Sequence, residues 1–229
     1  MKVVVLTGAG ISAESGLATF RDADGLWEGH RPEDVATPHA FRRDRRLVQR
    51  FYDERRASLA RVRPNAAHAA LARLEEALGD DLLLVTQNVD DLHERGGSRR
   101  VLHMHGELRR VRCQRCEARH EWEGTLADEP RCPSCNRRRA LRPDIVWFGE
   151  YPHGMDEIHE ALTEVDVFAA IGTSGVVYPA AGFVDYAHAA GATTVELNLV
   201  PTPNSDFHTT YEGPATEVVP RWVDHLMGS

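Results

Sequence analysis

Four cysteines form two Cys-x-x-Cys pairs separated by fifteen residues, and they are all the cysteines of this chain. Each pair can supply two thiolates from a tight turn, and four thiolates close a tetrahedron around Zn²⁺. Such a site leaves no position for water, so we expect a structural metal. Two disulfides or a redox dithiol are the alternatives. No signal sequence precedes the first residues, which predicts a reducing, cytoplasmic location where such pairs bind metal. The predicted ligands are Cys113, Cys116, Cys132 and Cys135.

A glycine-rich turn at residues 8–13 follows an apolar run at residues 2–7 that has the character of a buried strand. Glycines let the backbone approach a pyrophosphate, and amide groups at a helix start face its charge. Ala13 replaces the third glycine of the dinucleotide fingerprint, and no strand ending in an acid follows about 20 residues on. The turn predicts a nucleotide site but does not support hydride transfer.

Polar and small residues follow other predicted strands. Residues 87–90, Gln-Asn-Val-Asp, come at a strand's carboxyl end, where open α/β sheets place ligands. Carboxamides there can bind another carboxamide, although capping of a helix at 91–95 explains the same residues equally well. Small residues after two further strands fit the walls of a ribose and adenine pocket. These residues are Gly172, Thr173, Ser174 and Asn198.

Two histidines, His103 and His105, lie in a strand predicted at residues 101–105, where period-two alternation places them on one face. A histidine at a strand end is more often a hydrogen-bonded structural residue than a base. His105 points to the same sheet edge as the glycine turn, and we expect Gly106 to leave its ring open to approach. His105 is therefore the candidate general base.

The elements that must position these residues alternate between strands and helices. Strands are predicted at 2–7, 82–86, 101–105, 165–172 and 193–197, and helices at 65–78, 155–162, 180–190 and 217–227. This alternation predicts an α/β fold, a Rossmann-like open parallel sheet with helices on both faces, in a large domain. Two insertions are expected to form a small domain made of a helical module and a four-cysteine zinc ribbon. The predicted ranges are 1–29, 64–108 and 143–229 for the large domain, 30–63 for the helical module and 109–142 for the ribbon.

The charge of the 229-residue chain is unevenly distributed. Its formal net charge is −8, yet residues 41–63 hold nine Arg against three acids, and residues 109–142 hold ten against five. Basic patches can bind nucleic acid, but a net acidic chain argues against that partner. Trp122 is the one aromatic residue within 109–142, where single-strand binders need several. No apolar run approaches the ~20 residues of a membrane span.

The motifs occur in the order found in sirtuins, the NAD-dependent protein deacylases. The chain resembles this family over nearly its whole length and is most similar to the CobB-type bacterial members. The resemblance is carried by the glycine turn, Phe20-Arg21, residues 87–90, His105-Gly106, the cysteine pairs, residues 148–150 and Gly172-Thr173-Ser174.

The resemblance implies NAD as co-substrate, one structural Zn²⁺ and an acyl-lysine protein segment bound as an extended strand. It implies that His105 is the general base on a ribose hydroxyl, with nicotinamide, free lysine and O-acyl-ADP-ribose as products. The implied NAD contacts are Gly8, Ala9, Gly10, Ile11, Ser12, Glu14, Phe20, Arg21, Trp27, Gln87, Asn88, Asp90, Gly172, Thr173, Ser174, Asn198, Leu199, Val200 and Ala215. The implied contacts to the substrate backbone are Val146, Phe148, Gly149 and Glu150.

Tyr52 and Arg55 stand three apart and share one face of a predicted helix. In the sirtuins that prefer succinyl- and malonyl-lysine, a Tyr and an Arg at this spacing hold the acyl carboxylate, which a planar guanidinium suits. The alternative is that Arg55 is one more solvated arginine. Two other functions stay open: an ADP-ribosyltransferase on the same fold and a non-catalytic zinc-ribbon protein that binds nucleic acid.

Overall fold

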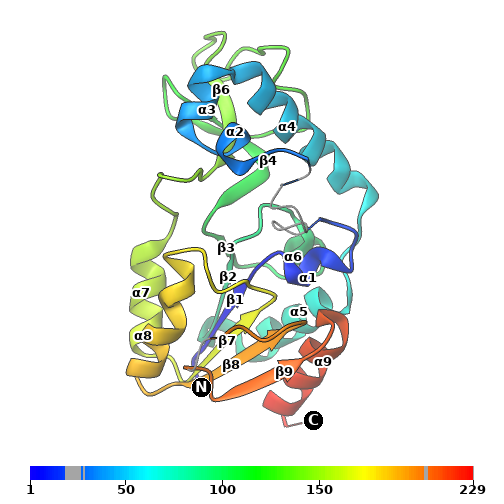
Figure 1. The fold of residues 1–229 in the computed structure, drawn as a ribbon, viewed down its shortest axis with the longest axis vertical. Helices are drawn as coiled ribbons and strands as arrows, with labels where there is room; N and C mark the ends of the chain where they lie inside the picture. Colours follow the sequence, from blue (N-terminus) through cyan, green and yellow to red (C-terminus); the bar gives the residue numbers. More distant parts are fainter. Residues whose placement is uncertain (19–26, 28, 204–205, 229) are drawn as a thin grey trace.

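The structure, a computed structural model, describes residues 1–18, 27, 29–203 and 206–228. Its centre is a six-stranded parallel sheet with the order β3-β2-β1-β7-β8-β9. The order reverses between β1 and β7 (Figure 1), and open sheets bind ligands at such a reversal, outside the carboxyl ends of the strands. The strands are β1 Val3–Thr7, β2 Leu82–Thr86, β3 Val101–His103, β7 Val167–Ile171, β8 Thr193–Asn198 and β9 Thr209–Glu212.

Helices cover both faces of this sheet because alternate side chains of its strands point in opposite directions. Val3 and Val5 of β1 are buried in one apolar cluster together with helices α5 and α9. Val4 and Leu6 are buried in the other, together with α7 and α8. The predicted α/β class is therefore confirmed. The four helices are α5 Ala66–Leu78, α7 Met155–Thr163, α8 Phe183–Ala189 and α9 Ala215–Leu226.

The ends of α5 follow from local sequence. The Asn65 side chain accepts the amide N–H of Ala67 at 3.0 Å, as an N-cap does. Gly79 ends the helix with φ +57°, a conformation that glycine adopts at little cost. Short helices follow the strands at the sheet's carboxyl edge, namely α1 Gly10–Ala13 and α6 Leu92–Arg95.

A smaller module lies above the carboxyl edge of the sheet (Figure 1). It combines helices with a three-stranded antiparallel sheet of order β5-β4-β6. Helix α4 packs on this sheet, since Arg45 and Gln49 donate to the Leu141 carbonyl and Arg56 donates to that of Leu108. The elements are α2 Pro32–Val35, α3 Pro38–Arg43, α4 Arg45–Ser58, β4 Gly106–Cys113, β5 Arg119–Glu121 and β6 Leu141–Ile145.

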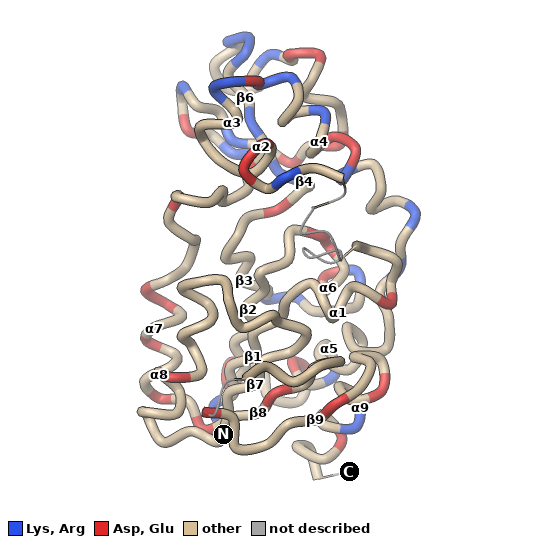
Figure 2. The backbone as a smooth tube through the Cα atoms, viewed as in Figure 1, with Lys and Arg blue, Asp and Glu red and all other residues tan. Residues whose placement is uncertain are grey.

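Basic residues are concentrated on this module, as Figure 2 shows. Several of them stabilise it rather than form a free positive surface: buried Arg56 pairs with Asp53, and Arg119 pairs with the buried Asp144. Within the described residues, no helix is both long and apolar enough to cross a membrane.

The main sheet differs from the prediction at two strands. The strand expected at 101–105 ends at His103, and residues 104 and 105 form a turn. Strand β9 was not predicted, because it is a four-residue edge strand without a buried residue. It is held by pairing with β8, from Val195↔Thr209 to Asn198↔Glu212. Such pairing is a long-range contact that a four-residue segment does not reveal.

Candidate active site and metal centre

A cleft of about 950 Å³ lies between the carboxyl edge of the parallel sheet and the smaller module. The structure brings nearly all of the sequence-predicted site residues to it. Those lining it are Gly8, Ala9, Gly10, Ser12, Glu14, Trp27, Tyr52, Arg55, Gln87, Asn88, Asp90, His105, Val146, Phe148, Gly149, Glu150, Gly172, Thr173, Ser174, Asn198, Leu199, Val200 and Ala215.

Three predicted NAD contacts are not among the residues that line the cleft. Ile11 is fully buried in the apolar core under the sheet, so its side chain packs rather than binds. Phe20 and Arg21 lie outside the described residues.

The glycine turn after β1 packs tightly on the turn after β7. A Cβ on Gly10 would lie 2.6 Å from Cα of Gly172, and a Cβ on Gly172 would lie 2.5 Å from the Ile11 nitrogen. Gly172 also has φ +60°. The glycines of the first turn are expected to let the backbone approach a pyrophosphate. The structure adds that they let two turns meet at the point where the strand order reverses.

The loop after β2 meets the glycine turn through side chains. Asn88 donates from Nδ2 to the Gly8 carbonyl at 3.1 Å, and Ser12 Oγ donates to Asp90 Oδ2 at 3.2 Å. Burial raises the pKa of Asp90, although hydrogen bonds from the Leu92 amide and Ser12 oppose the rise. The capping interpretation holds in part: the N-cap residue of α6 is Asp91, whose side chain makes no cap hydrogen bond, but Asp90 Oδ1 accepts the Leu92 amide N–H at 3.0 Å. Asp90 therefore fixes the helix start and the cleft wall together.

His105 lies in the turn after β3 and lines the cleft. Its Nδ1 is 3.1 Å from the Gln87 carbonyl oxygen, which can only accept, so Nδ1 carries the hydrogen. Nε2 of the neutral ring is then the free base. Burial lowers the pKa of His105 and the nearby His153 adds to this, while the Gln87 hydrogen bond opposes it. The ring is therefore mostly neutral at pH 7.

One expectation about this turn is wrong. The histidines do not share the cleft: among the described residues His103 contacts Asn88 and Glu94, and His105 lines the cleft, because the strand ends between them. The structure gives Gly106 a further role. It has φ +82°, and a Cβ on it would lie 2.0 Å from the Asp144 carbonyl oxygen, so it lets β4 pair with β6.

At the smaller module, Tyr52 and Arg55 of α4 both line the cleft. Tyr52 is fully buried, its hydroxyl oxygen accepts the Trp147 Nε1–H at 3.0 Å, and burial raises its pKa. The Arg55 guanidinium lies 3.9 Å from the ring centre of Phe51 and donates to the Phe51 carbonyl. Trp147 was not among the predicted site residues, because no local pattern reveals its long-range hydrogen bond to Tyr52.

The predicted substrate-binding segment follows β6. Val146 donates its amide N–H to the His105 carbonyl, and Phe148 is about half exposed. Glu150 is held by Arg142, with Nη1 to Oε1 at 2.7 Å, and accepts the Trp147 amide N–H. Burial raises the pKa of Glu150, but Arg142 and that amide lower it overall. Glu150 thus braces the segment.

The opposite end of the cleft contains the residues predicted for the adenosine. Asn198 donates from Nδ2 to the Thr173 carbonyl at 2.8 Å, joining the turns after β7 and β8. Leu199 and Val200 are 65% and 71% exposed, so they offer apolar surface at the cleft mouth. The Glu14 carboxylate accepts from the Thr216 hydroxyl and amide, which ties the glycine turn to α9.

The four cysteines gather at the far end of the smaller module, with their Sγ atoms all within 4.8 Å of one another. All four lie in the described part of the chain and are free thiols. Cys113 and Cys135 Sγ are 3.7 Å apart, and Cys116 and Cys132 Sγ are 3.8 Å apart. Disulfide sulfurs lie about 2.05 Å apart, whereas thiolates about 2.3 Å from a tetrahedral zinc lie about 3.8 Å apart. The residues fit a structural zinc site.

The two Cys-x-x-Cys turns, or knuckles, have the same backbone conformation, which explains why each pair has two residues between its cysteines. Glu117 and Asn136, each directly after the second cysteine of a pair, have φ near +60°. Their amides donate to the carbonyls of Cys113 and Cys132. Each turn thereby brings its two thiols to the same side.

Replacing Cys132 with Ser should abolish zinc binding and unfold the ribbon. Binding free energy at such sites, about 10–16 kcal/mol in zinc-finger peptides, is folding free energy. Elemental analysis should find one zinc per chain in the wild type, and thermal unfolding should fall sharply in the variant. Ser134→Ala, in the same knuckle, is the matched control and should keep its zinc. Full zinc content in Cys132→Ser would contradict the assignment.

Comparisons with known proteins agree with this geometry. The family model described as "Sir2 family" matches residues 8–179. The chain belongs to the Sir2 family. It is 59% identical to an NAD-dependent protein deacylase of Salmonella typhimurium, covering 99% of this chain and 84% of that protein. It is 60% identical to one of Yersinia pseudotuberculosis, covering 98% and 82%.

Solved Sir2 structures have the same fold. A Sir2 homologue–NAD complex superposes with a TM-score of 0.89 at 42% identity, covering 99% of this chain and 90% of that one. A Sir2–p53 peptide–NAD⁺ structure superposes with a TM-score of 0.84 at 32% identity, covering 100% and 94%.

Proposed function

We propose that this Sir2 chain is an NAD-dependent protein-lysine deacylase that releases nicotinamide and O-acyl-ADP-ribose. The observation that carries the proposal is the placement of His105: its Nδ1 is anchored on Gln87 and its ring lines the cleft that the glycine turn also lines. Relatives at 59–60% identity are named NAD-dependent protein deacylases.

NAD supplies the ribosyl carbon that accepts the acyl oxygen, with nicotinamide as leaving group. The chain's own residues would position the reactants: Asn88 and Asp90 at the nicotinamide end, and Asn198 with Ala215 at the adenosine end. Holding two reactants in line supplies much of such a rate. His105 Nε2 then accepts a proton from a ribose hydroxyl, with Nδ1–H kept on the Gln87 carbonyl. Burial suits this role because it keeps the ring neutral.

The second substrate is proposed to be an acyl-lysine segment of a protein, bound in extended form along residues 146–150. The half-exposed Phe148 and the position of residues 146–150 along the cleft wall support the proposal. Four free cysteines gathered for a metal also fit the predicted cytoplasmic location, since reducing compartments favour metal sites over disulfides.

The direct test is mass spectrometry of acetyl-, succinyl- and malonyl-lysine peptides incubated with and without NAD. We expect unmodified lysine and O-acyl-ADP-ribose only when NAD is present. An ADP-ribosylated peptide or protein without loss of the acyl group would instead favour the transferase. Peptides unchanged in the presence of NAD would contradict the proposal.

The acid limb of the pH profile should report His105. Its base form is the active one, and its pKa lies below the ordinary value of about 6.5. On the acid side of the profile, kcat/KM should therefore rise with pH through a midpoint below that value. His153→Asn should move the midpoint upward, because His153 contributes to the lowered pKa of His105. A midpoint above 6.5 in the wild type would contradict the assignment.

A further inference from the structure

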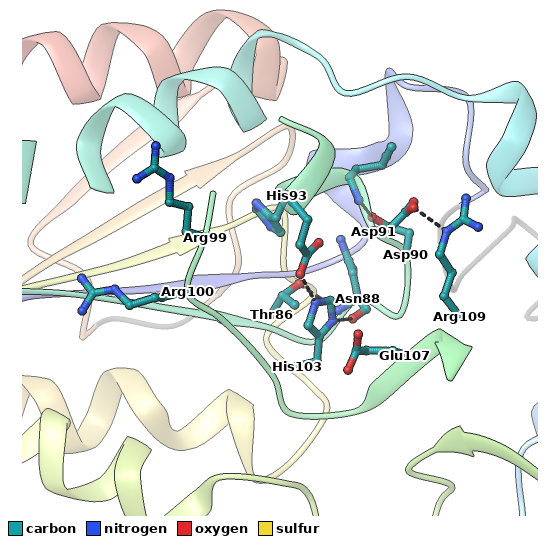
Figure 3. A network of polar contacts seen from close by, with 12 residues as sticks. Thr86, Asn88, Asp90, Asp91, His93, Arg99, Arg100, His103, Glu107 and Arg109 are labelled. Carbon is teal, nitrogen blue, oxygen red and sulfur yellow. Dashed lines mark hydrogen bonds and ion pairs between the residues drawn. The ribbon is translucent and has the colours of Figure 1, made fainter. Parts of the chain in front are cut away.

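His103 is a buried histidine for which the proposed mechanism has no use. Its side chain is 7% exposed and does not line the cleft. Figure 3 shows its ring beside Asn88, with the Glu107 carboxylate nearby. Nδ1 lies 3.2 Å from the Asn88 carbonyl oxygen, and Nε2 lies 2.7 Å from Glu94 Oε1. A carbonyl and a carboxylate can only accept, so both ring nitrogens must donate and the ring is an imidazolium.

The groups around the ring agree with this protonation state. Burial lowers the pKa of His103, but the hydrogen bond and charge of Glu94, with smaller contributions from Glu107 and Asn88, raise it overall. Asp90 also faces it, with a raised pKa, and His93 on α6 has a lowered pKa and is neutral. No other cation among the described residues is shown to oppose the charge on His103.

The loop that His103 contacts has no regular structure of its own. Residues 87–91 lie between β2 and α6, and their backbone is held by groups from other segments. Gln87 O accepts from His105, Asn88 O from His103, and Val89 O from the Leu108 amide. Two histidines two positions apart thus hold two consecutive carbonyls. The same loop carries the Asn88 and Asp90 side chains into the cleft.

We propose that His103, paired with Glu94, is a positioning residue that fixes the 87–90 loop to receive the nicotinamide end of NAD. The inference rests on the proposed function. Asn88 transmits the effect, because its carbonyl is held by His103 while its Nδ2 holds the Gly8 carbonyl of the glycine turn. At the adenosine end of the cleft, Asn198 instead bonds to the Thr173 carbonyl, whereas the partners of His103 are Asn88 and Glu94.

This role gives the ring a pH dependence opposite to that of His105. A histidine with a raised pKa contributes its hydrogen bonds below that pKa and loses them as pH rises through it. The kcat/KM for NAD should therefore fall on the alkaline side, while His105 sets the acid side.

The test compares binding of NAD and of ADP-ribose by calorimetry, because ADP-ribose lacks the nicotinamide. His103→Ala should weaken NAD binding roughly tenfold, the value of one charge-assisted hydrogen bond. ADP-ribose binding should stay near the wild-type value. His103→Asn places an amide N–H where Nδ1 was and does not titrate, so it should restore NAD binding and remove the alkaline fall. Glu94→Gln should move that fall to lower pH.

Glu107→Gln is the matched control, since it removes a neighbouring carboxylate that pairs with Arg110 rather than with His103. It should leave NAD binding unchanged and shift the alkaline fall less than Glu94→Gln. Equal weakening of NAD and ADP-ribose in His103→Ala would show a merely structural residue and overturn the inference, as would an alkaline fall that persists in His103→Asn. Wild-type protein that binds ADP-ribose but does not bind NAD would overturn the proposed function, and this inference with it.

Discussion

Replacing His105 with Ala should lower kcat for deacylation by about 10²–10⁴-fold, the usual contribution of a general base. His105 lies beside residues 87–90 on the described cleft wall, and its hydrogen bond to Gln87 fixes its tautomer. Its Nε2 is therefore the base that this part of the cleft offers. The ring lies at the cleft wall and is only partly buried, so the variant should fold normally.

The variant His105→Asn tests the general-base role of His105 apart from its hydrogen bond to the Gln87 carbonyl. An Asn side chain can still donate to the Gln87 carbonyl, which keeps the loop in place, but it cannot accept a proton at neutral pH. Activity of His105→Asn should be as low as that of His105→Ala. Exchange of labelled nicotinamide into NAD should survive better than product formation in both, because the base acts after the nicotinamide bond breaks. Near-wild-type turnover in a folded variant would remove His105 from the mechanism.

The residues that meet at the cleft could be predicted because they follow strands. Gly8, Gln87 and Gly172 come directly after β1, β2 and β7, and parallel strands bring their carboxyl ends to one edge. The zinc site was predictable for a similar reason, since each knuckle is a local turn and the spacing is its signature. In both, a short-range pattern carries the information.

What could not be predicted depends on contacts between distant segments. Trp147 donates a hydrogen bond to Tyr52, 95 positions away in the sequence. Gly106 is required because a Cβ there would collide with the backbone of β6. The pairing of His103 with Glu94 depends on where β3 ends. The strand was predicted to end at residue 105, two residues later than it does. Period-two alternation predicts which side chains of a strand share a face, but contacts with neighbouring segments determine where the strand ends.

The acyl preference should change most in Arg55→Met. If the guanidinium pairs with a succinyl carboxylate inside the cleft, its removal leaves that charge buried and unpaired. The cost to kcat/KM for succinyl peptide should be about 2–5 kcal/mol. An acetyl group carries no carboxylate, and Met can keep the apolar contact with Phe51, so deacetylation should be spared. Arg50→Met, an exposed arginine on the same helix, is the control and should change neither activity.

Tyr52→Phe should give a smaller change in acyl preference together with a loss of stability that Arg55→Met does not share. The Tyr52 hydroxyl accepts the buried Trp147 Nε1–H, so its removal leaves that donor without an acceptor, at about 1–3 kcal/mol. The same hydroxyl has one hydrogen left to donate to an acyl carboxylate. Thermal unfolding separates the two effects, and kcat/KM on matched acetyl and succinyl peptides measures the preference. Equal loss of both activities in Arg55→Met would show that Arg55 has a structural role through its contact with Phe51 within α4 and does not select the acyl group.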